Sequence, residues 1–593
     1  MLSTLSHDEN LDRGSDIPII GYLVTPSDTN RYLILCDKRN MNLSFWENSL
    51  LFVRYQVRMR DGQIVPAEVL CCTGEIKLEN PFNQTPLHHV TLASFGREME
   101  YDSNYQSDQK YIEVFPIASL NLTTGEHIPI GVPPSNSKFF FVEDSQLERY
   151  YRSQSTTFKV GYLSGTDVTI GLDIRHFGSG EKGWGDARMM GIAGRTGSGK
   201  TVIVGTLIGA YATHPELGIL IIDPQGQFSS TDGNGVYVGE LGKDPSKWSW
   251  QLSQAFTKAG RMNDVYIVNT SEIGFGNDLE TFQFLLRKHK FWEAIKGGIK
   301  SEKVENAEER LMHHLKIELS SHHNSLCKMQ WNQQLFNTIV DIIASTYSNA
   351  DKVRDDILAR EQGSCPPSEK GEEVWTHVLS YFNPHLRPMS MDKIIHDVLV
   401  ERRIVILNID REDDDMKELY YLKLFSSLKL KAQRIYRQAL AAGQQSDVNA
   451  LFVLDEAQRI IPEHPESEMK KKIVGVIRDS INTSRKLGTG WIFATQSVTN
   501  IDKGIWGQLG TKFIGYGFGT GADKDRLSEI CGKDTSILNR YGRMPMPLQT
   551  GKYWFMVQGE MIGIGNGNQC LFIDAFSSQA EIFRHNAHLF PPK

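Results

Sequence analysis

The chain has 593 residues, which is too long for one hydrophobic core, so two to four domains are expected. Its net charge of −7 argues against a protein that coats nucleic acid, so any DNA contact must be local, for example inside a pore. No apolar run approaches the roughly 18 residues that cross a bilayer. The seven cysteines include no Cys-x-x-Cys pair. These features predict a cytoplasmic protein with reduced thiols and no membrane segment.

The N-terminal quarter of the chain has the pattern of a small β-barrel. Residues 1–16 are polar and are expected to form a short disordered tail, not a signal peptide. Residues 17–145 contain short apolar stretches between glycine and asparagine turns, which favours a barrel. Residues 146–185 are interpreted as a connector that contains one more strand pair.

A phosphate-binding loop follows the connector. Residues 189–193 form an apolar run of strand type, and residues 202–210 have helical length. Strand, glycine loop and helix is the context that a P-loop requires. The loop residues predicted to bind the nucleotide are Gly194, Arg195, Thr196, Gly197, Ser198, Gly199, Lys200 and Thr201. Lys200 is predicted to reach the β- and γ-phosphates of ATP, and the Thr201 hydroxyl to hold Mg²⁺.

The rest of the chain predicts an α/β fold, a RecA-like parallel-sheet P-loop ATPase core. Five further apolar runs of strand type alternate with helical stretches, which is typical of a parallel sheet covered on both faces. Residues 186–270 are assigned to the first part of this core, and residues 401–593 to its second part and the C-terminal segment. Residues 271–400 are too long for a loop and have helical periodicity, so they predict a helical insertion, with a flexible tip at residues 363–371.

Polar side chains follow the apolar runs, where functional groups of parallel sheets lie. Asp455 is predicted to contact Mg²⁺ through water, and Glu456 to polarise the attacking water. An Asp-Glu pair also occurs at plain helix N-caps. Gln496 is a candidate sensor for the γ-phosphate and the water, and a polar loop is the alternative. Asp223 could lie near the metal and nucleotide, or it could cap a turn.

Two arginines are candidates for stabilising the negative charge that develops in phosphoryl transfer. Arg188 precedes the P-loop strand, and Arg485 lies between the carboxylate pair and Gln496. Both positions lie away from the carboxyl ends of the strands, so each arginine is predicted to act in the site of a neighbouring subunit. The alternative for each is a surface or interface ion pair. Basic segments at residues 423–437 and 470–472 are weak candidates for a DNA-facing surface.

Together these motifs resemble the HerA family, within the HerA–FtsK group of hexameric ATPases. The resemblance covers residues 15–590 and rests on the P-loop, the turn at residues 223–226, and residues 455–457, 485–486 and 494–496, in this order. The family turn usually ends in glutamate, whereas this chain has Gln227.

The resemblance implies a homohexameric helicase-type motor that moves double-stranded DNA through a central pore. It also implies that the N-terminal barrel docks an effector, either a nuclease or a sirtuin-like NADase, in DNA processing or anti-phage defence. The rival hypothesis is an ATP-regulated scaffold that activates an effector without productive translocation.

Overall fold

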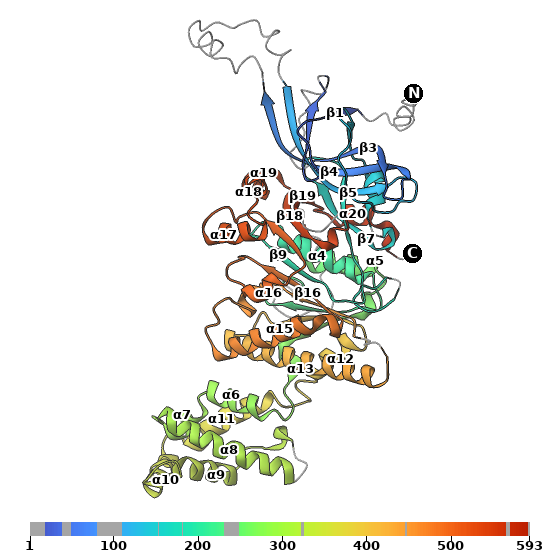
Figure 1. The fold of residues 1–593 in the computed structure, drawn as a ribbon. Helices are drawn as coiled ribbons and strands as arrows, with labels where there is room; N and C mark the ends of the chain where they lie inside the picture. The colour runs from blue at the N-terminus through green and yellow to red at the C-terminus, as the bar shows by residue number, and fades with distance from the viewer. Residues whose placement is uncertain are drawn as a thin grey trace, which may run out of the picture.

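A computed structural model describes residues 18–37, 39, 49–79, 109–151, 153–180, 182–229, 248–321, 325–444, 448–564 and 570–590. The predicted residue 1–16 tail lies outside these ranges. The described chain forms a barrel, a large central sheet with helices on both faces, and a helical bundle at the end remote from the barrel (Figure 1).

The N-terminal barrel is closed, with strand order β1-β2-β5-β4-β3-β6. Its strands are β1 (Ile19–Val24), β2 (Tyr32–Cys36), β3 (Leu50–Arg58), β4 (Ile64–Glu79), β5 (Gln109–Asn121) and β6 (Lys138–Phe141). In β2 the buried residues Tyr32, Ile34 and Cys36 alternate with half-buried ones, as expected when one face of a strand fills a barrel interior. The predicted N-terminal β-barrel is confirmed.

The central sheet has eleven strands in the order β11-β14-β10-β15-β16-β9-β17-β18-β19-β7-β8. The strands from β11 to β17 in this order are parallel, and the remaining ones pair antiparallel. The parallel strands are β9 (Met189–Ala193), β10 (Gly218–Asp223), β11 (Val265–Asn269), β14 (Ile404–Asn408), β15 (Ala450–Leu454), β16 (Thr489–Thr495) and β17 (Thr511–Gly515). The antiparallel strands are β7 (Thr157–Leu163), β8 (Thr169–Asp173), β18 (Tyr553–Gly559) and β19 (Cys570–Ala575).

The segment predicted as a connector, residues 146–185, contributes to this sheet. Its strand pair, β7 and β8, extends the antiparallel end, where β7 pairs with β19. The core sheet therefore begins before residue 186, earlier than the sequence indicated. Residue spacing alone could not show this, because the partner of β7 lies some four hundred residues further along the chain. The added pair covers an edge that β19 would otherwise expose.

Successive residues of the parallel strands pack into two different cores. Ile219 and Ile221 of β10 belong to a cluster with the helices α4 and α5, whereas Leu220 and Ile222 belong to a cluster with α12, α13 and α15. This period of two follows from the pleat of a strand that is covered on both faces. The helices are α4 (Lys200–Ala212), α5 (Trp248–Lys258), α12 (Met391–Leu399), α13 (Asp414–Ala441) and α15 (Glu468–Leu487). The predicted parallel-sheet P-loop core is confirmed.

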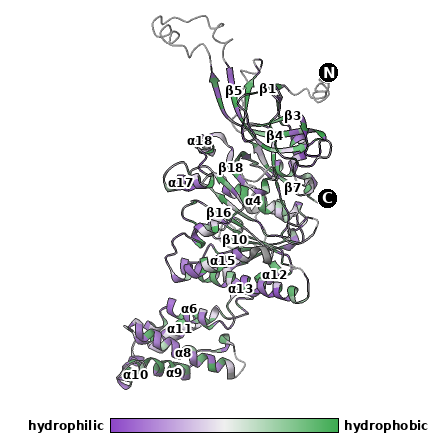
Figure 2. Ribbon diagram, viewed as in Figure 1, coloured by the Kyte–Doolittle hydropathy of each residue, from purple (hydrophilic) through white to green (hydrophobic). Residues whose placement is uncertain are grey.

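The helical insertion forms the bundle at the far end of the molecule (Figure 1). Its helices are α6 (Leu279–Lys288), α7 (Phe291–Lys296), α8 (Ser301–Ser321), α9 (Gln333–Ala344), α10 (Ala350–Ala359) and α11 (Pro367–Ser380). Figure 2 shows hydrophilic and hydrophobic residues side by side on these helices, as expected for amphipathic elements. The tip predicted at residues 363–371 is instead partly helical, because Pro367 begins α11 at a position where proline favours a helix.

Shorter elements complete the described fold. The two-stranded sheet of β12 (Ile273–Gly274) and β13 (Met389–Ser390) closes the base of the insertion. The remaining helices are α3 (Asp144–Leu147), α14 (Ala457–Ile460), α16 (Lys503–Gly507), α17 (Gly521–Ile530), α18 (Thr535–Gly542), α19 (Pro547–Thr550) and α20 (Gln579–His585). Among the described residues, none of the helices combines the length and apolar character needed to cross a membrane.

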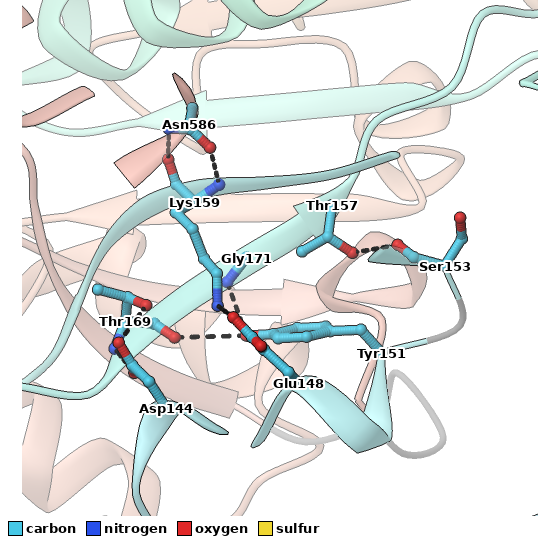
Figure 3. Close-up of polar contacts among 9 residues, drawn as sticks. All are labelled: Asp144, Glu148, Tyr151, Ser153, Thr157, Lys159, Thr169, Gly171 and Asn586. Atoms are coloured by element: carbon cyan, nitrogen blue, oxygen red, sulfur yellow. Dashed lines mark hydrogen bonds and ion pairs between the residues drawn. The ribbon is translucent and has the colours of Figure 1, made fainter. Parts of the chain in front are cut away.

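The barrel is joined to the central sheet through polar contacts of the segment after β6 (Figure 3). The Asp144 carboxylate accepts hydrogen bonds from the Thr169 backbone N–H at 2.7 Å and from its hydroxyl at 3.0 Å. The Tyr151 hydroxyl accepts the Gly171 N–H at 2.9 Å. Asp144 and Tyr151 belong to the segment that links the barrel to the sheet. Their hydrogen bonds hold this linker against β8 at two points.

The C-terminus is tied to the same junction. Asn586 is fully buried, and its side-chain amide accepts the Lys159 N–H at 2.6 Å and donates to the Lys159 carbonyl at 2.8 Å (Figure 3). The Lys159 ammonium lies 4.8 Å from the centre of the Tyr151 ring and 4.0 Å from a Glu148 carboxylate oxygen. Burial lowers the pKa of Lys159. Lys159 of β7 thus contacts the segment after β6 through its side chain and the C-terminal segment through its backbone.

Candidate active site

Four parallel strands end at one edge of the sheet and place the predicted site residues together. Strand β16 lies between β9 and β15, and β10 follows β15. A cavity of about 250 Å³ opens where these strands end. Its lining residues are Thr196, Gly197, Gly199, Lys200, Thr201, Val202, Gln225, Gln227, Asp455, Glu456, Gln496 and Tyr553. The P-loop, the carboxylate pair and the candidate sensor therefore face one space.

The P-loop has the backbone geometry of an anion cradle. Gly199 has a φ of 91° and lies against the Tyr553 ring, where a Cβ atom would be only 2.5 Å from a ring carbon, so glycine is required there. The Ser198 hydroxyl is buried and has no hydrogen-bond partner within the described structure. Helix α4 begins at Lys200, so its unpaired N–H groups point at the loop. The loop fits a bound phosphate group.

The Lys200 ammonium is held over the P-loop. It donates to the Gly194 carbonyl at 2.7 Å and to the Arg195 carbonyl at 3.4 Å. Burial lowers the pKa of Lys200, although the nearby carboxylates Asp455 and Glu456 favour its charged form. Phosphate oxygens in the cavity would favour the charged form further, because they bring opposite charge close to the ammonium.

The two carboxylates after β15 are both buried, at 5% exposure each. Burial and the adjacent Glu456 carboxylate raise the pKa of Asp455 to about 7. Glu456 has a φ of 51° and a ψ of 41°, a left-handed conformation that is costly for a residue with a side chain. Such strain persists only where the surrounding structure imposes it, and it is concentrated at functional sites.

The Glu456 carboxylate accepts hydrogen bonds from two glutamine amides. Gln496 Nε2 donates to Oε1 at 2.5 Å, and Gln458 Nε2 donates to Oε2. The other end of the Gln496 amide, Oε1, accepts a hydrogen bond from the Thr196 hydroxyl at 3.4 Å. The candidate sensor thus connects the P-loop to the candidate base, as expected of a group that responds to a γ-phosphate.

The donor set beside the P-loop fits a magnesium ion. The Thr201 hydroxyl and the Asp455 carboxylate both line the cavity, and Mg²⁺ prefers such oxygen ligands. Thr201 Oγ1 donates to Gln227 Oε1 at 3.4 Å. Thr201 and Asp455 would hold the ion, directly or through water, and the ion would offset phosphate charge.

Asp223 is engaged in the turn that follows β10. Its carboxylate accepts hydrogen bonds from the backbone N–H groups of Gln227 at 2.9 Å, Phe228 at 2.8 Å and Ser229 at 2.7 Å, and from the Ser229 hydroxyl at 2.8 Å. Burial raises the pKa of Asp223, although these hydrogen bonds act in the opposite direction. The side chain is fully buried and does not line the cavity. The geometry supports the turn-capping alternative over nucleotide contact.

Arg188, the candidate arginine whose side chain the structure describes, does not line the cavity. Arg188 lies before β9, at the opposite edge of the sheet; its guanidinium donates to Glu560 at 2.5 Å and stacks over the Trp184 ring at 4.4 Å. This contact is the predicted ion-pair alternative, although a role in a neighbouring subunit stays a prediction. Arg485 lies within α15, but its side chain is outside the described ones, so its role also stays a prediction.

Sequence reasoning missed several residues at this site. Gln225 and Gln227 line the cavity and belong to the turn after β10. In the sequence, only the resemblance of this turn to that of the HerA family could have indicated them. Gln458 follows Glu456 by two residues and could have been found from that proximity. Tyr553 comes from β18, more than three hundred residues after the P-loop, and no sequence pattern indicates that it reaches Gly199.

Comparison with known proteins gives one family match. Residues 158–244 match the model described as "Helicase HerA, central domain", a range that includes most of β7, the P-loop and the turn after β10. A comparison with curated protein sequences gives no match.

Several solved structures align with most of this chain, at low identity. VirB4 of Thermoanaerobacter pseudethanolicus aligns at 12% identity and a TM-score of 0.37, over 72% of this chain and 99% of that one. The bacterial conjugative coupling protein TrwBdeltaN70 aligns at 12% identity and a TM-score of 0.37, over 74% and 92%. The pCW3 conjugation coupling protein TcpA aligns at 11% identity and a TM-score of 0.30, over 91% and 92%.

The cavity has the geometry of a P-loop ATPase site, and the HerA match covers residues 158–244, so the chain resembles the HerA–FtsK group of ATPases. The predicted resemblance to this group is confirmed, and so is the assignment of the protein as an ATPase.

Replacing Glu456 by Gln tests the proposed role of this carboxylate. The amide keeps the shape of the side chain but cannot accept a proton, so we expect hydrolysis to fall roughly 10²- to 10⁴-fold while ATP binding is retained. Phosphate release and binding of a fluorescent ATP analogue should be measured together, with Lys200→Ala as a variant that also loses binding. A parallel loss of both activities in Glu456→Gln would mean that the residue is structural.

An ion-pair swap separates the two roles of Arg188. The Arg188–Glu560 pair is partly exposed, with side-chain exposures of 19% and 41%, and such pairs stabilise by up to about 1 kcal/mol. We expect Arg188→Ala to lose most hydrolysis while still binding ATP, as for a group that acts in a neighbour's site. The double variant Arg188→Glu with Glu560→Arg should regain thermal stability without regaining hydrolysis. If the swap restores hydrolysis, Arg188 is only an ion-pair partner.

Proposed function

We propose that the chain is the subunit of a homohexameric ring that uses ATP hydrolysis to move double-stranded DNA through its pore. The observation that carries the proposal is the composition of the cavity, in which Lys200 is the single cationic side chain among the described lining residues. Phosphoryl transfer develops more negative charge than one lysine and a metal ion offset. A ring in which a neighbour supplies a further cation completes the site.

The DNA-binding part of the proposal rests on the HerA match and on exposed basic groups. Most lysines of the predicted basic segments are in ion pairs within the chain: Lys423 with Asp278 at 2.6 Å, and Lys429 with Asp479 at 2.8 Å. Arg434 and Arg437 of α13 are exposed, and no ion pair is recorded for either among the described residues. These two arginines are the better candidates for phosphate contacts in a pore.

The effector is proposed to dock on the barrel. Ile64 and Leu78, near opposite ends of β4, are exposed by 66% and 65%, so each end of this strand offers a large apolar side chain to a partner. The proposed effector is a nuclease or a sirtuin-like NADase, and the proposed setting is DNA processing or anti-phage defence.

The rival function is an ATP-regulated scaffold that activates an effector without productive translocation. The pairing of the basic segments favours it, because neutralised lysines contribute little to binding a phosphate backbone.

Duplex DNA distinguishes the two functions. For a motor, we expect linear double-stranded DNA to raise ATP turnover several-fold, less so at high salt, and the ring to displace a protein roadblock from the duplex. Arg434→Gln with Arg437→Gln should reduce the stimulation but keep the DNA-free rate, and Lys471→Gln, whose ammonium is paired with Glu468 at 2.6 Å, is the matched control. A rate that ignores DNA, with the roadblock left in place, would support the scaffold.

Barrel variants test effector docking. We expect Ile64→Asp with Leu78→Asp to abolish capture of a nuclease or NADase effector, because a charge on an apolar contact surface must be desolvated. ATP hydrolysis should be unchanged, since both residues are remote from the cavity. Leu386→Asp, at an apolar residue outside the barrel that is 62% exposed, serves as a control for an added charge. Undiminished capture by the double variant in a pull-down would place the docking site elsewhere.

A further inference from the structure

Gln458 belongs to a closed hydrogen-bonded triangle with Glu456 and Gln496. Its Nε2 donates to Glu456 Oε2, and its Oε1 accepts the backbone N–H of Gln496 at 3.4 Å. Gln496 Nε2 donates in turn to Glu456 Oε1 at 2.5 Å. Each oxygen of the Glu456 carboxylate therefore receives one amide donor, and the two amides come from different elements, α14 and the end of β16.

The local backbone explains why an amide is present at residue 458. The left-handed conformation of Glu456 ends β15 abruptly, and the single-turn helix α14 begins at the next residue. This turn brings the side chain of Gln458 back toward the carboxylate. Without such a donor, the buried Glu456 carboxylate would have one unpaired oxygen beside the carboxylate of Asp455, and mutual repulsion would turn it away.

Gln458 is separated from the nucleotide itself. It does not line the cavity that contains the P-loop, but lines a second cavity of about 340 Å³ between α13 and the turn after β10. Neighbouring lining residues of this second cavity include Pro224, Tyr421 and Arg459. Any influence of Gln458 on hydrolysis must therefore pass through Glu456 or Gln496.

We propose that Gln458 is a positioning residue that fixes the orientation of the Glu456 carboxylate toward the attacking water. The inference rests on the proposed role of Glu456 in ATP hydrolysis. A carboxylate offers about four lone-pair sites, so the two amide bonds leave an acceptor site on each oxygen for water. Gln496, which also contacts Thr196 of the P-loop, donates to one carboxylate oxygen, and Gln458 donates to the other oxygen.

Two substitutions of similar size test the role of the amide donor. Gln458→Met removes the donor, and we expect kcat for ATP hydrolysis to fall roughly 10- to 100-fold, the effect of losing a hydrogen bond to a charged group. Gln458→Glu replaces the donor by a second carboxylate oxygen, and kcat should fall further. KM and the affinity for a non-hydrolysable ATP analogue should stay within about twofold of the wild type, because Gln458 does not line the nucleotide cavity.

A double-mutant cycle separates positioning from a general structural effect. In the Glu456→Gln background, Gln458→Met should lower the residual hydrolysis no further, since the carboxylate that it orients is gone. Gln508→Glu is the matched control, because that amide donates to Asn482 at 3.0 Å on the exposed surface, and its kcat should match the wild type. Thermal unfolding of each variant verifies folding.

The outcomes are distinct. If folded Gln458→Met and Gln458→Glu keep kcat within about twofold, or raise it, Gln458 does not position the carboxylate and the inference is refuted. Additive losses in the Glu456→Gln background refute it as well. A wild-type ring that does not hydrolyse ATP would instead refute the proposed function, whatever the variants show.

Discussion

The parallel alignment of β9, β16, β15 and β10 is the constraint on which the site depends. Parallel strands end at the same edge, so four separate loops deliver their polar residues to one cavity. Strand β16 lies between β9 and β15 in the sheet, so Gln496, which follows β16, lies between the P-loop and the carboxylate pair. That position allows one amide to contact Thr196 on one side and Glu456 on the other.

The fold holds these groups at an energetic cost. Asp455 and Glu456 are buried side by side, and the effect of burial on Asp455 is large enough to raise its pKa to about 7. Glu456 adds a left-handed backbone, which costs on the order of 1–3 kcal/mol. The amide donors of Gln458 and Gln496 offset part of this cost. Neither the buried carboxylates nor the strained backbone of Glu456 stabilises the hydrophobic core. Their presence is therefore consistent with a functional site.

The sequence predicted those parts of the site that follow from local pattern. The P-loop, the carboxylate pair and Gln496 each stand at the end of an apolar run, and parallel strands bring such ends together without any further information. The barrel and the insertion were predictable from a change of periodicity from two to that of a helix. Strand pairings between residues far apart in the sequence could not be predicted, because nothing in the residues of β7 or β18 shows that they join the core sheet.

The distinction between a cap and a ligand was also beyond the sequence. Asp223 ends a strand just as Asp455 does, yet its carboxylate is saturated by the N–H groups of the turn after β10, whereas Asp455 lines the cavity. The difference depends on the backbone of the following residues. Asp223 is followed by a turn whose N–H groups fold back onto it, while Asp455 is followed by the left-handed Glu456, which directs the chain away.

The distribution of cations is the physical basis for the proposed contribution of a second chain to the site. Lys200 is the single cation among the described lining residues of the cavity, and the acidic side chains of Asp455 and Glu456 lie beside it. Arg188 is turned to Glu560 at the far edge of the sheet, and other basic residues near the site, such as Lys470, are paired with glutamates of the same chain. Bound triphosphate would add further negative charge. In the proposed ring, a cation from a neighbouring subunit would offset the charge that develops during hydrolysis, and each site would then be sensitive to the position of its neighbour.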